Sequence, residues 1–445
     1  MNFLLGIVVW LVLSAAWTSC GRLLVGDLAA APPLATAVHW MSGSVAWHLG
    51  LQSLDLIGVP WSPPLLAAVA LVLLAARAAA APSRAAIDWR PWALSLPFAG
   101  LFFWGASTLR AASSDFVYHW GIKGKRFAEV RGIDWDYLRL PDNGFAHPDY
   151  PMLVSEQFAS LAILTGVWDD RAQFLWSLTA FALLLHAAAG LLLAGFERAP
   201  LGVALHCGLA ASLTAFCLGY FQAGSADLHI ALPLLVGAGL LATGRRDPAR
   251  AAELTLAIGG VAAFAASSKI EGIPFAFGLL GLCWWLRRLA TPWKRFALAA
   301  APAVLAVLSW WLLATRYELF QPTNLGSPNP FRWPIVQEQI VGQLRLEEWH
   351  RLPWLILLSP LLLSSRRSRA FGLVAGAQLA LFLYVYVAAP VDPVFWIVSS
   401  FPRALLQILP TALVGLALLL GVDSSTPSED SEESETPSPS RQEKP

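Results

Sequence analysis

The sequence predicts an all-α polytopic membrane protein that crosses the bilayer about thirteen times. Of its 445 residues, 57% are hydrophobic and only 13% are charged. Apolar runs long enough to cross ~30 Å of hydrocarbon recur along the chain. A soluble domain averages about 25% charged residues. The composition therefore excludes a soluble enzyme, and it equally excludes a disordered or coiled-coil protein.

Each predicted span is an apolar run bounded by polar or turn-forming residues. The second run is the least apolar because Gln52, Asp55 and two histidines interrupt it, and the eleventh is short. In chain order, the predicted spans are Phe3–Cys20, Thr36–Gly58, Pro64–Ala81, Ala93–Ala111, Phe174–Gly195, Leu201–Leu218, Leu228–Ala242, Ala252–Ala266, Ile273–Leu286, Phe296–Ala314, Leu352–Leu363, Ala370–Ala388 and Ala404–Val422.

The basic residues predict the orientation of these spans. After residue 82, Lys and Arg cluster on alternate connections, as at Arg198 and at Arg366 with Arg367. Short cytoplasmic loops carry such an excess, so we expect these connections on the cytoplasmic side. Two long polar stretches, residues 112–171 and 316–351, then fall on the outer side. They mix aromatic residues and proline with their charges, which predicts an outer-face loop domain containing interfacial helices.

The net charge of +1 combines two unlike regions. Residues 1–422 carry 28 basic and 22 acidic residues, whereas residues 423–445 carry 2 and 7. The Ser-, Pro- and Glu-rich end is too polar to bury a core, so we expect a disordered acidic cytoplasmic tail. The predicted organisation is N-terminal transmembrane helices (1–92), a transmembrane core with the two outer loops (93–422), and this tail.

The first outer loop holds the first candidate site. Phe116, Trp120 and Phe127 recur at roughly helical spacing, with Lys123 among the polar positions between them. This pattern predicts an amphipathic interfacial helix whose aromatic side contacts lipid tails and whose cations meet phosphates. Asp115 lies where that helix leaves the membrane. It is either a functional carboxylate or a helix N-cap that follows two serines.

Farther along this loop, His147 and Tyr150 lie in a turn-rich stretch that two prolines hold extended. His147 is interpreted either as a ligand or proton carrier, or as a structural turn residue.

Four charged residues interrupt apolar sequence on the same predicted side: Asp227, Lys269, Glu271 and Arg403. Lys269 and Glu271 separate two short spans, which indicates a broken helix where ionisable groups tend to be functional. Alternatively, the two side chains simply neutralise each other. Carboxylates that activate an acceptor, together with cations that stabilise a phosphate, suit group transfer. The same set also suits an anion transporter.

The order of these features resembles membrane glycosyltransferases of the C type (GT-C fold). This group includes protein mannosyltransferases, the lipid A aminoarabinose transferase and rhizobial lipopolysaccharide glycosyltransferases. The resemblance covers roughly residues 93–421. Its matching elements are Ser114-Asp115, the stretch from Tyr118 to Lys125, His147-Pro148-Asp149-Tyr150-Pro151, Ala226-Asp227-Leu228, Lys269-Ile270-Glu271-Gly272, and Arg403 ahead of the last predicted helix.

The resemblance implies an inverting transfer of a sugar from a polyprenyl-phosphate donor to the hydroxyl of a glycan, lipid or protein acceptor. The site would face the periplasm or exterior of a bacterial inner membrane. The resemblance implies that Asp115 is the catalytic base. It also makes Lys123, Lys269 and Arg403 candidates for holding the lipid phosphate. Trp120 would line the lipid groove. The other candidate substrate-binding residues are His147, Tyr150, Asp227 and Glu271.

No metal ligand is assigned, and a divalent cation is left open as a cofactor. The expected partners are the lipid-linked donor, the acceptor and membrane lipid, with no nucleic acid. Two other functions remain open. A transporter or flippase for an anionic lipid-linked sugar would use the same broken helices, although its two similar halves are not visible in the sequence. A non-catalytic GT-C-like membrane protein is the other.

Overall fold

The computed structural model describes residues 2–29, 31–80, 88–108, 113–196, 198–219, 223–243, 248–287, 292–319, 328–345, 352–388 and 392–421. These ranges are predominantly helical and contain no β-strand, which confirms the predicted all-α class. The predicted acidic tail, residues 423–445, lies outside the described residues.

The helical elements follow the order of the predicted spans, with additional short helices in the polar loops. They are α1 (Asn2–Val25), α2 (Pro32–Leu56), α3 (Pro63–Ala79), α4 (Arg90–Thr108), η1 (Phe116–Trp120), α5 (Gly121–Val130), α6 (Trp135–Arg139), η2 (Pro141–Ala146), α7 (Leu153–Thr165), α8 (Asp170–Gly195), α9 (Ala199–Gly219), α10 (Asp227–Ala242), α11 (Pro248–Ser268), α12 (Gly272–Arg287), α13 (Trp293–Arg316), η3 (Pro330–Arg332), α14 (Trp333–Leu344), η5 (Leu352–Ser364), α15 (Arg369–Ala388) and α16 (Pro393–Leu420).

Seven of the described helices are long and apolar enough to cross a membrane: α1, α8, α9, α11, α13, α15 and α16. Shorter apolar helices, among them α3, α10 and α12, accompany them. The chain is therefore an all-α integral membrane protein, and the count of about thirteen crossings stays a prediction. The short eleventh span corresponds to the 3₁₀ helix η5.

The last helix begins earlier than expected, and this moves Arg403. The predicted span started at Ala404, but α16 begins at Pro393, where the Asp392 side chain accepts a hydrogen bond from the Val394 N–H (3.0 Å). Pro402 suggests a boundary in the sequence, yet proline is tolerated inside membrane helices when neighbouring groups satisfy the backbone. Arg403 consequently lies in the interior of α16 rather than ahead of it.

The loop after α4 forms the predicted helices, but its aromatic side faces protein. Phe116, Trp120 and Phe127 are all buried within the molecule, and the Phe116 ring packs edge-on against Phe158 and Phe174. The expectation that these side chains contact lipid tails is therefore wrong. An amphipathic pattern shows that one face is apolar, and it does not distinguish lipid from a neighbouring apolar helix such as α7.

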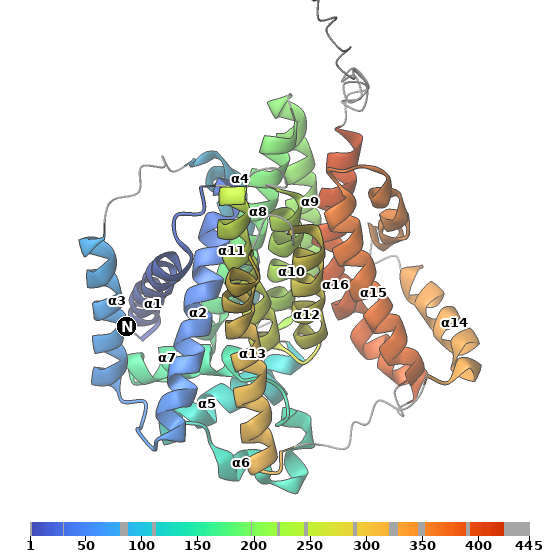
Figure 1. Ribbon diagram of the computed structural model, residues 1–445. Helices are drawn as coiled ribbons and strands as arrows, with labels where there is room; N and C mark the ends of the chain where they lie inside the picture. The colour runs from blue at the N-terminus through green and yellow to red at the C-terminus, as the bar shows by residue number, and fades with distance from the viewer. Residues whose placement is uncertain are drawn as a thin grey trace, which may run out of the picture.

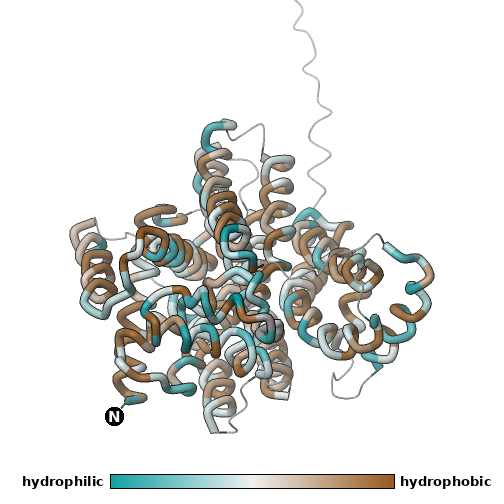
Figure 2. Tube along the Cα trace, turned by 90° about the horizontal axis from the view of Figure 1, so that it is seen from below, coloured by the Kyte–Doolittle hydropathy of each residue, from teal (hydrophilic) through white to brown (hydrophobic). Residues whose placement is uncertain are grey.

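The long helices run side by side, and α5, α6 and α7 lie across one end of them (Figure 1). Seen from that end, hydrophilic and hydrophobic residues are interspersed (Figure 2). Asp55 of α2 fixes this layer, because its carboxylate accepts hydrogen bonds from the Ile133 N–H and the Trp135 indole, each 2.9 Å long. The polar loop is thus a packed layer attached to the helices.

Reciprocal glycines bring α1 and α2 into backbone contact. A β-carbon at Gly21 would overlap the His39 backbone carbonyl, and one at Gly43 would overlap that of Trp17. Two small residues at one crossing let membrane helices approach closely.

We expect Gly43→Ala to destabilise the protein by about 3 kcal/mol, because the added methyl group can be accommodated only by separating the two helix backbones. Thermal unfolding of the purified protein in detergent measures the effect. Gly50→Ala on the same helix is the matched control, since nothing lies within 4 Å of its new β-carbon. Equal melting temperatures for the two variants would contradict the close-contact explanation.

Candidate functional site

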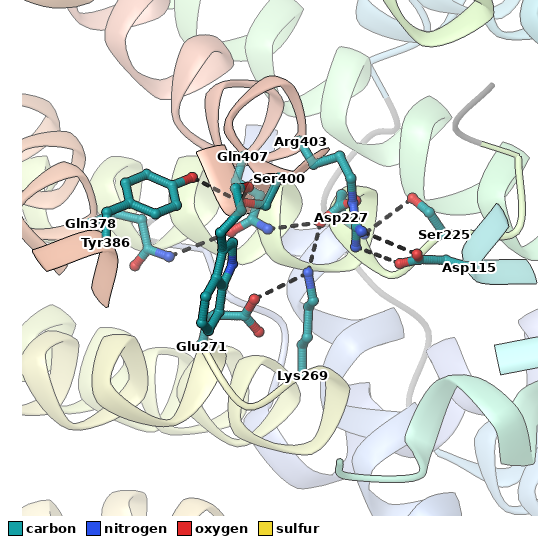
Figure 3. Close-up of polar contacts among 11 residues, drawn as sticks. Asp115, Ser225, Asp227, Lys269, Glu271, Gln378, Tyr386, Ser400, Arg403 and Gln407 are labelled. Atoms are coloured by element: carbon teal, nitrogen blue, oxygen red, sulfur yellow. Dashed lines mark hydrogen bonds and ion pairs between the residues drawn. The ribbon is translucent and has the colours of Figure 1, made fainter. Parts of the chain in front are cut away.

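Arg403 joins two carboxylates from distant parts of the chain (Figure 3). Its two terminal nitrogens donate to the carboxylate of Asp115, which immediately precedes η1, with Nη1 3.0 Å from Oδ1 and Nη2 bonded to Oδ2. Its Nε donates to Oδ2 of Asp227, the first residue of α10, at 2.8 Å. One guanidinium therefore holds both carboxylates at a fixed separation.

Lys269 extends this chain of charges. Its Nζ donates to Oδ1 of Asp227 at 3.0 Å and lies 3.2 Å from Oε1 of Glu271. We call Asp115, Arg403, Asp227, Lys269 and Glu271 the charge network. The sequence prediction that these groups lie together is matched by these contacts.

Most of the charge network is buried. Asp227 is fully buried, and Asp115 and Lys269 are 6% and 5% exposed, whereas the side chains of Arg403 and Glu271 are 27% and 21% exposed. Buried charges are tolerated only when they are paired and hydrogen-bonded. Three carboxylates face two cations here, so the network carries an excess of acidic groups.

Local structure leaves the Asp115 carboxylate available to Arg403. The Ser113 hydroxyl accepts the hydrogen bond from the Phe116 N–H at 2.9 Å, whereas the Asp115 side chain makes no capping bond. The Ser113 N–H donates to the Ala223 carbonyl at 3.0 Å, which ties this segment to the chain just before α10. The N-cap alternative for Asp115 is therefore wrong, and the capping side chain is that of Ser113.

The predicted helix break between α11 and α12 is present. Residues 269–271 form a turn in which the Gly272 N–H donates to the Lys269 carbonyl at 2.9 Å. A β-carbon at Gly272 would overlap the Ala265 carbonyl, so this position requires glycine. Lys269 does pair with Glu271, as the simple neutralisation alternative expected, but it also binds the more deeply buried Asp227.

A second group of predicted residues forms an aromatic cluster beside η1. The Nζ of Lys123 donates to the His147 carbonyl at 3.2 Å and lies 4.6 Å from the centre of the Trp120 ring. The rings of His147 and Tyr150 stack at 4.6 Å, and Trp120 lies 6.0 Å from Tyr150. Lys123 is completely buried, so in this conformation its ammonium does not meet surface phosphates as the sequence suggested.

Burial sets the protonation of this aromatic cluster. It lowers the pKa of Lys123 to about 7, although the charges of Asp149 and Asp115 oppose the shift. It also lowers the pKa of His147 to about 4, with Lys123 adding to the effect, so this imidazole is neutral at neutral pH. The pKa of Tyr150 is raised by burial and further by Glu271. The charge of Glu271, a member of the charge network, therefore affects the ionisation of the Tyr150 hydroxyl.

The pKa of Asp115 lies above its ordinary carboxyl value. Burial is the main cause, and the nearby charge of Asp227 adds to it, while Arg403 opposes both. A carboxylate with a raised pKa accepts a proton more readily than an exposed one.

Two glutamines that were not among the predicted site residues extend the network between α15 and α16. Gln407 Nε2 donates to Oδ1 of Asp227 at 2.8 Å, and Gln378 Nε2 donates to the side-chain Oε1 of Gln407 at 3.4 Å (Figure 3). Gln407 lies four residues after Arg403, which places both on one face of α16. An amide one turn from a charged residue in an otherwise apolar helix was the signal that could have identified it.

Within the described ranges, no three His, Cys, Asp or Glu side chains are grouped so that they could hold a metal ion. A surface hollow of about 560 Å³ lies along α14, between Pro334 and Arg345. None of the charge-network residues lines it, and its lining belongs to one exposed helix. We therefore place the candidate site at the charge network.

We expect Arg403→Met to destabilise the protein by about 3–5 kcal/mol, because it leaves two buried carboxylates without their shared cation. Arg403→Lys should recover only part of this loss, since an ammonium cannot make the forked contact to Asp115. Thermal unfolding in detergent checks both, with the exposed Arg345→Met as control. An Arg403→Met variant as stable as the control would show that the network contributes nothing to folding.

Compared with protein family models, with curated proteins and with solved structures, the chain matches none.

Proposed function

We propose that this protein transfers a sugar from a polyprenyl-phosphate donor to an acceptor hydroxyl, with inversion at the anomeric carbon. The observation that carries this proposal is the buried contact of Asp115 with Arg403 and, through it, with Asp227 and Lys269. Three carboxylates and two cations lie together at the ends of apolar helices. Lipid-linked sugar phosphates present both a long apolar chain and an anionic group to such a site.

Asp115 is the proposed base. In the transfer step the acceptor oxygen attacks the anomeric carbon while the bond from that carbon to the phosphate oxygen breaks. The hydroxyl proton passes to the Asp115 carboxylate, and the polyprenyl phosphate leaves with the bonding electrons. A single displacement inverts the anomeric centre. The raised pKa of Asp115 supports this role, because a base works best when its pKa approaches the working pH.

Arg403 and Lys269 are the proposed partners of the donor phosphate. Both are paired with carboxylates in this structure, so the phosphate would exchange with part of those contacts. The planar guanidinium suits a phosphate as well as a carboxylate, because both accept parallel N–H bonds. Lys123, whose contacts are the His147 carbonyl and the Trp120 ring, is a further hydrogen-bond donor for the phosphate beside the same segment when it is protonated.

The remaining assignments belong to the same proposal. The site would face the periplasm or exterior of a bacterial plasma membrane, and the acidic tail would be cytoplasmic, since basic residues mark alternate connections. A GT-C-like fold and about thirteen membrane crossings complete the assignment.

Asp115→Asn should lower sugar transfer about 100-fold or more, because the amide cannot accept the hydroxyl proton. The measurement uses protein purified with its native lipid, identifies any bound polyprenyl-phosphate sugar by mass spectrometry, and follows formation of a glycosylated product. Asp136→Asn, at an exposed position of α6, is the matched control. Retained transfer in Asp115→Asn would remove the base assignment. Net movement of labelled lipid without any glycosylated product would instead favour a transporter.

Transfer should also depend on pH through Asp115. The base acts when ionised, so activity is present above its pKa and lost as the pH falls through it. Because that pKa is raised, the acidic limb of the pH–rate profile should lie above the value of about 3.9 for a free carboxyl. A profile flat down to that value would contradict an Asp115 base.

A further inference from the structure

Helix α7 is buried along its length, yet it carries several polar side chains. Ser155, Glu156, Gln157 and Ser160 are each no more than 2% exposed. Burying a polar group is unfavourable unless it is hydrogen-bonded. Apolar side chains would be enough to pack a short helix in this position. The hydrogen-bond partners of the four polar side chains therefore indicate an additional role for α7.

Two of the four side chains bind the elements that carry the site carboxylates. The Ser155 hydroxyl donates to the Trp120 carbonyl at 3.1 Å, at the end of η1 and five residues after Asp115. The Oε1 atom of Gln157 lies 3.0 Å from Nε2 of His229, two residues after Asp227. Ser155 and Gln157 lie within one turn of α7 on nearly opposite sides of the helix, and together they reach both carboxylate-bearing segments.

The other two side chains anchor α7 to α2. Oε2 of Glu156 lies 2.6 Å from Nδ1 of His48, and the Ser160 hydroxyl accepts a hydrogen bond from the Trp47 indole at 3.0 Å. Since α2 is itself in backbone contact with α1, α7 is attached to the closely packed pair of α1 and α2.

Helices α5 and α7 are in close contact at Gly124. A β-carbon at Gly124 would lie 2.7 Å from the Phe158 β-carbon and 2.8 Å from the Ser155 carbonyl oxygen. Real β-carbons essentially never approach other atoms so closely, so the two helices touch through the glycine. A change in the position of α7 would therefore also move the segment that carries Asp115.

We infer that α7 sets the relative position of Asp115 and Asp227, with Ser155 and Gln157 as positioning residues. This inference rests on the proposed function, in which the position of Asp115 matters for proton transfer. When a donor phosphate takes contacts of Arg403, the two carboxylates lose part of their shared cation. The bonds from α7 then keep Asp115 in place for proton transfer.

Hydrogen exchange of the full-length protein in detergent, read by mass spectrometry, tests this inference without any substrate. Gln157→Leu removes the acceptor of His229, so amide exchange should rise about tenfold in residues 223–231, and also in residues 113–121 because Arg403 joins the two segments. Gln157→Glu keeps an acceptor oxygen and should return exchange to the wild-type rate. The exposed Gln337→Leu on α14 is the control.

Unchanged exchange at residues 223–231 would overturn the inference. So would a rise spread evenly over the molecule with a lower melting temperature, since that result describes a merely structural residue. If Gln157→Leu does not accumulate, Ser155→Ala takes its place, with the increase expected first at residues 113–121. The exchange measurement does not depend on sugar transfer. A wild-type protein without transfer activity would contradict the proposed function alone, whereas unchanged exchange would contradict the role of α7 alone.

Discussion

The site depends on a single cation shared by two buried carboxylates. The segments that carry Asp115 and Asp227 lie against each other, because the Ser113 N–H donates to the Ala223 carbonyl. Without a cation between them the two carboxylate charges would repel each other in a medium of low dielectric constant. The guanidinium of Arg403 suits this position because it is planar, always charged and able to donate in several directions. Lys269 and Gln407 then satisfy the remaining acceptor of Asp227. The arrangement of η1, α10, α11 and α16 at this end follows from that requirement.

Composition and periodicity were sufficient for the class of fold. Apolar runs predicted the seven described helices that are long and apolar enough to cross a membrane, since in lipid a helix satisfies its own backbone hydrogen bonds. The helix break at Lys269 was also predictable, since charged residues beside a glycine separate two short apolar runs. The start of α16 was not predictable, because the sequence does not distinguish a proline inside a membrane helix from one at its start. The groups that satisfy the backbone around such a proline come from neighbouring helices, which the sequence does not identify.

Parts of the site followed from residue type, and other parts required three dimensions. Ionisable residues in apolar sequence are few, so Asp115, Asp227 and Arg403 were recognisable individually. Their pairing was not, because contacts between distant segments leave no periodic signal. Lys123 shows the limit most clearly: its place on an amphipathic helix suggested an exposed cation, whereas the packing of α7 against α5 buries it beside Trp120. The buried polar face of α7 has the same origin, since its partners lie on three other elements.

The separation of the paired residues along the chain bears on how the protein is made. Asp115 and Arg403 are 288 positions apart, and Arg403 lies in the last described helix. During synthesis Asp115 and Asp227 therefore emerge long before the cation that joins them. Asp227 can already pair with Lys269 at that stage, whereas Asp115 has no cation until α16 is inserted. Completion of the site is thus a late event in biogenesis, and a chain that stops before α16 would leave the Asp115 carboxylate without its cation.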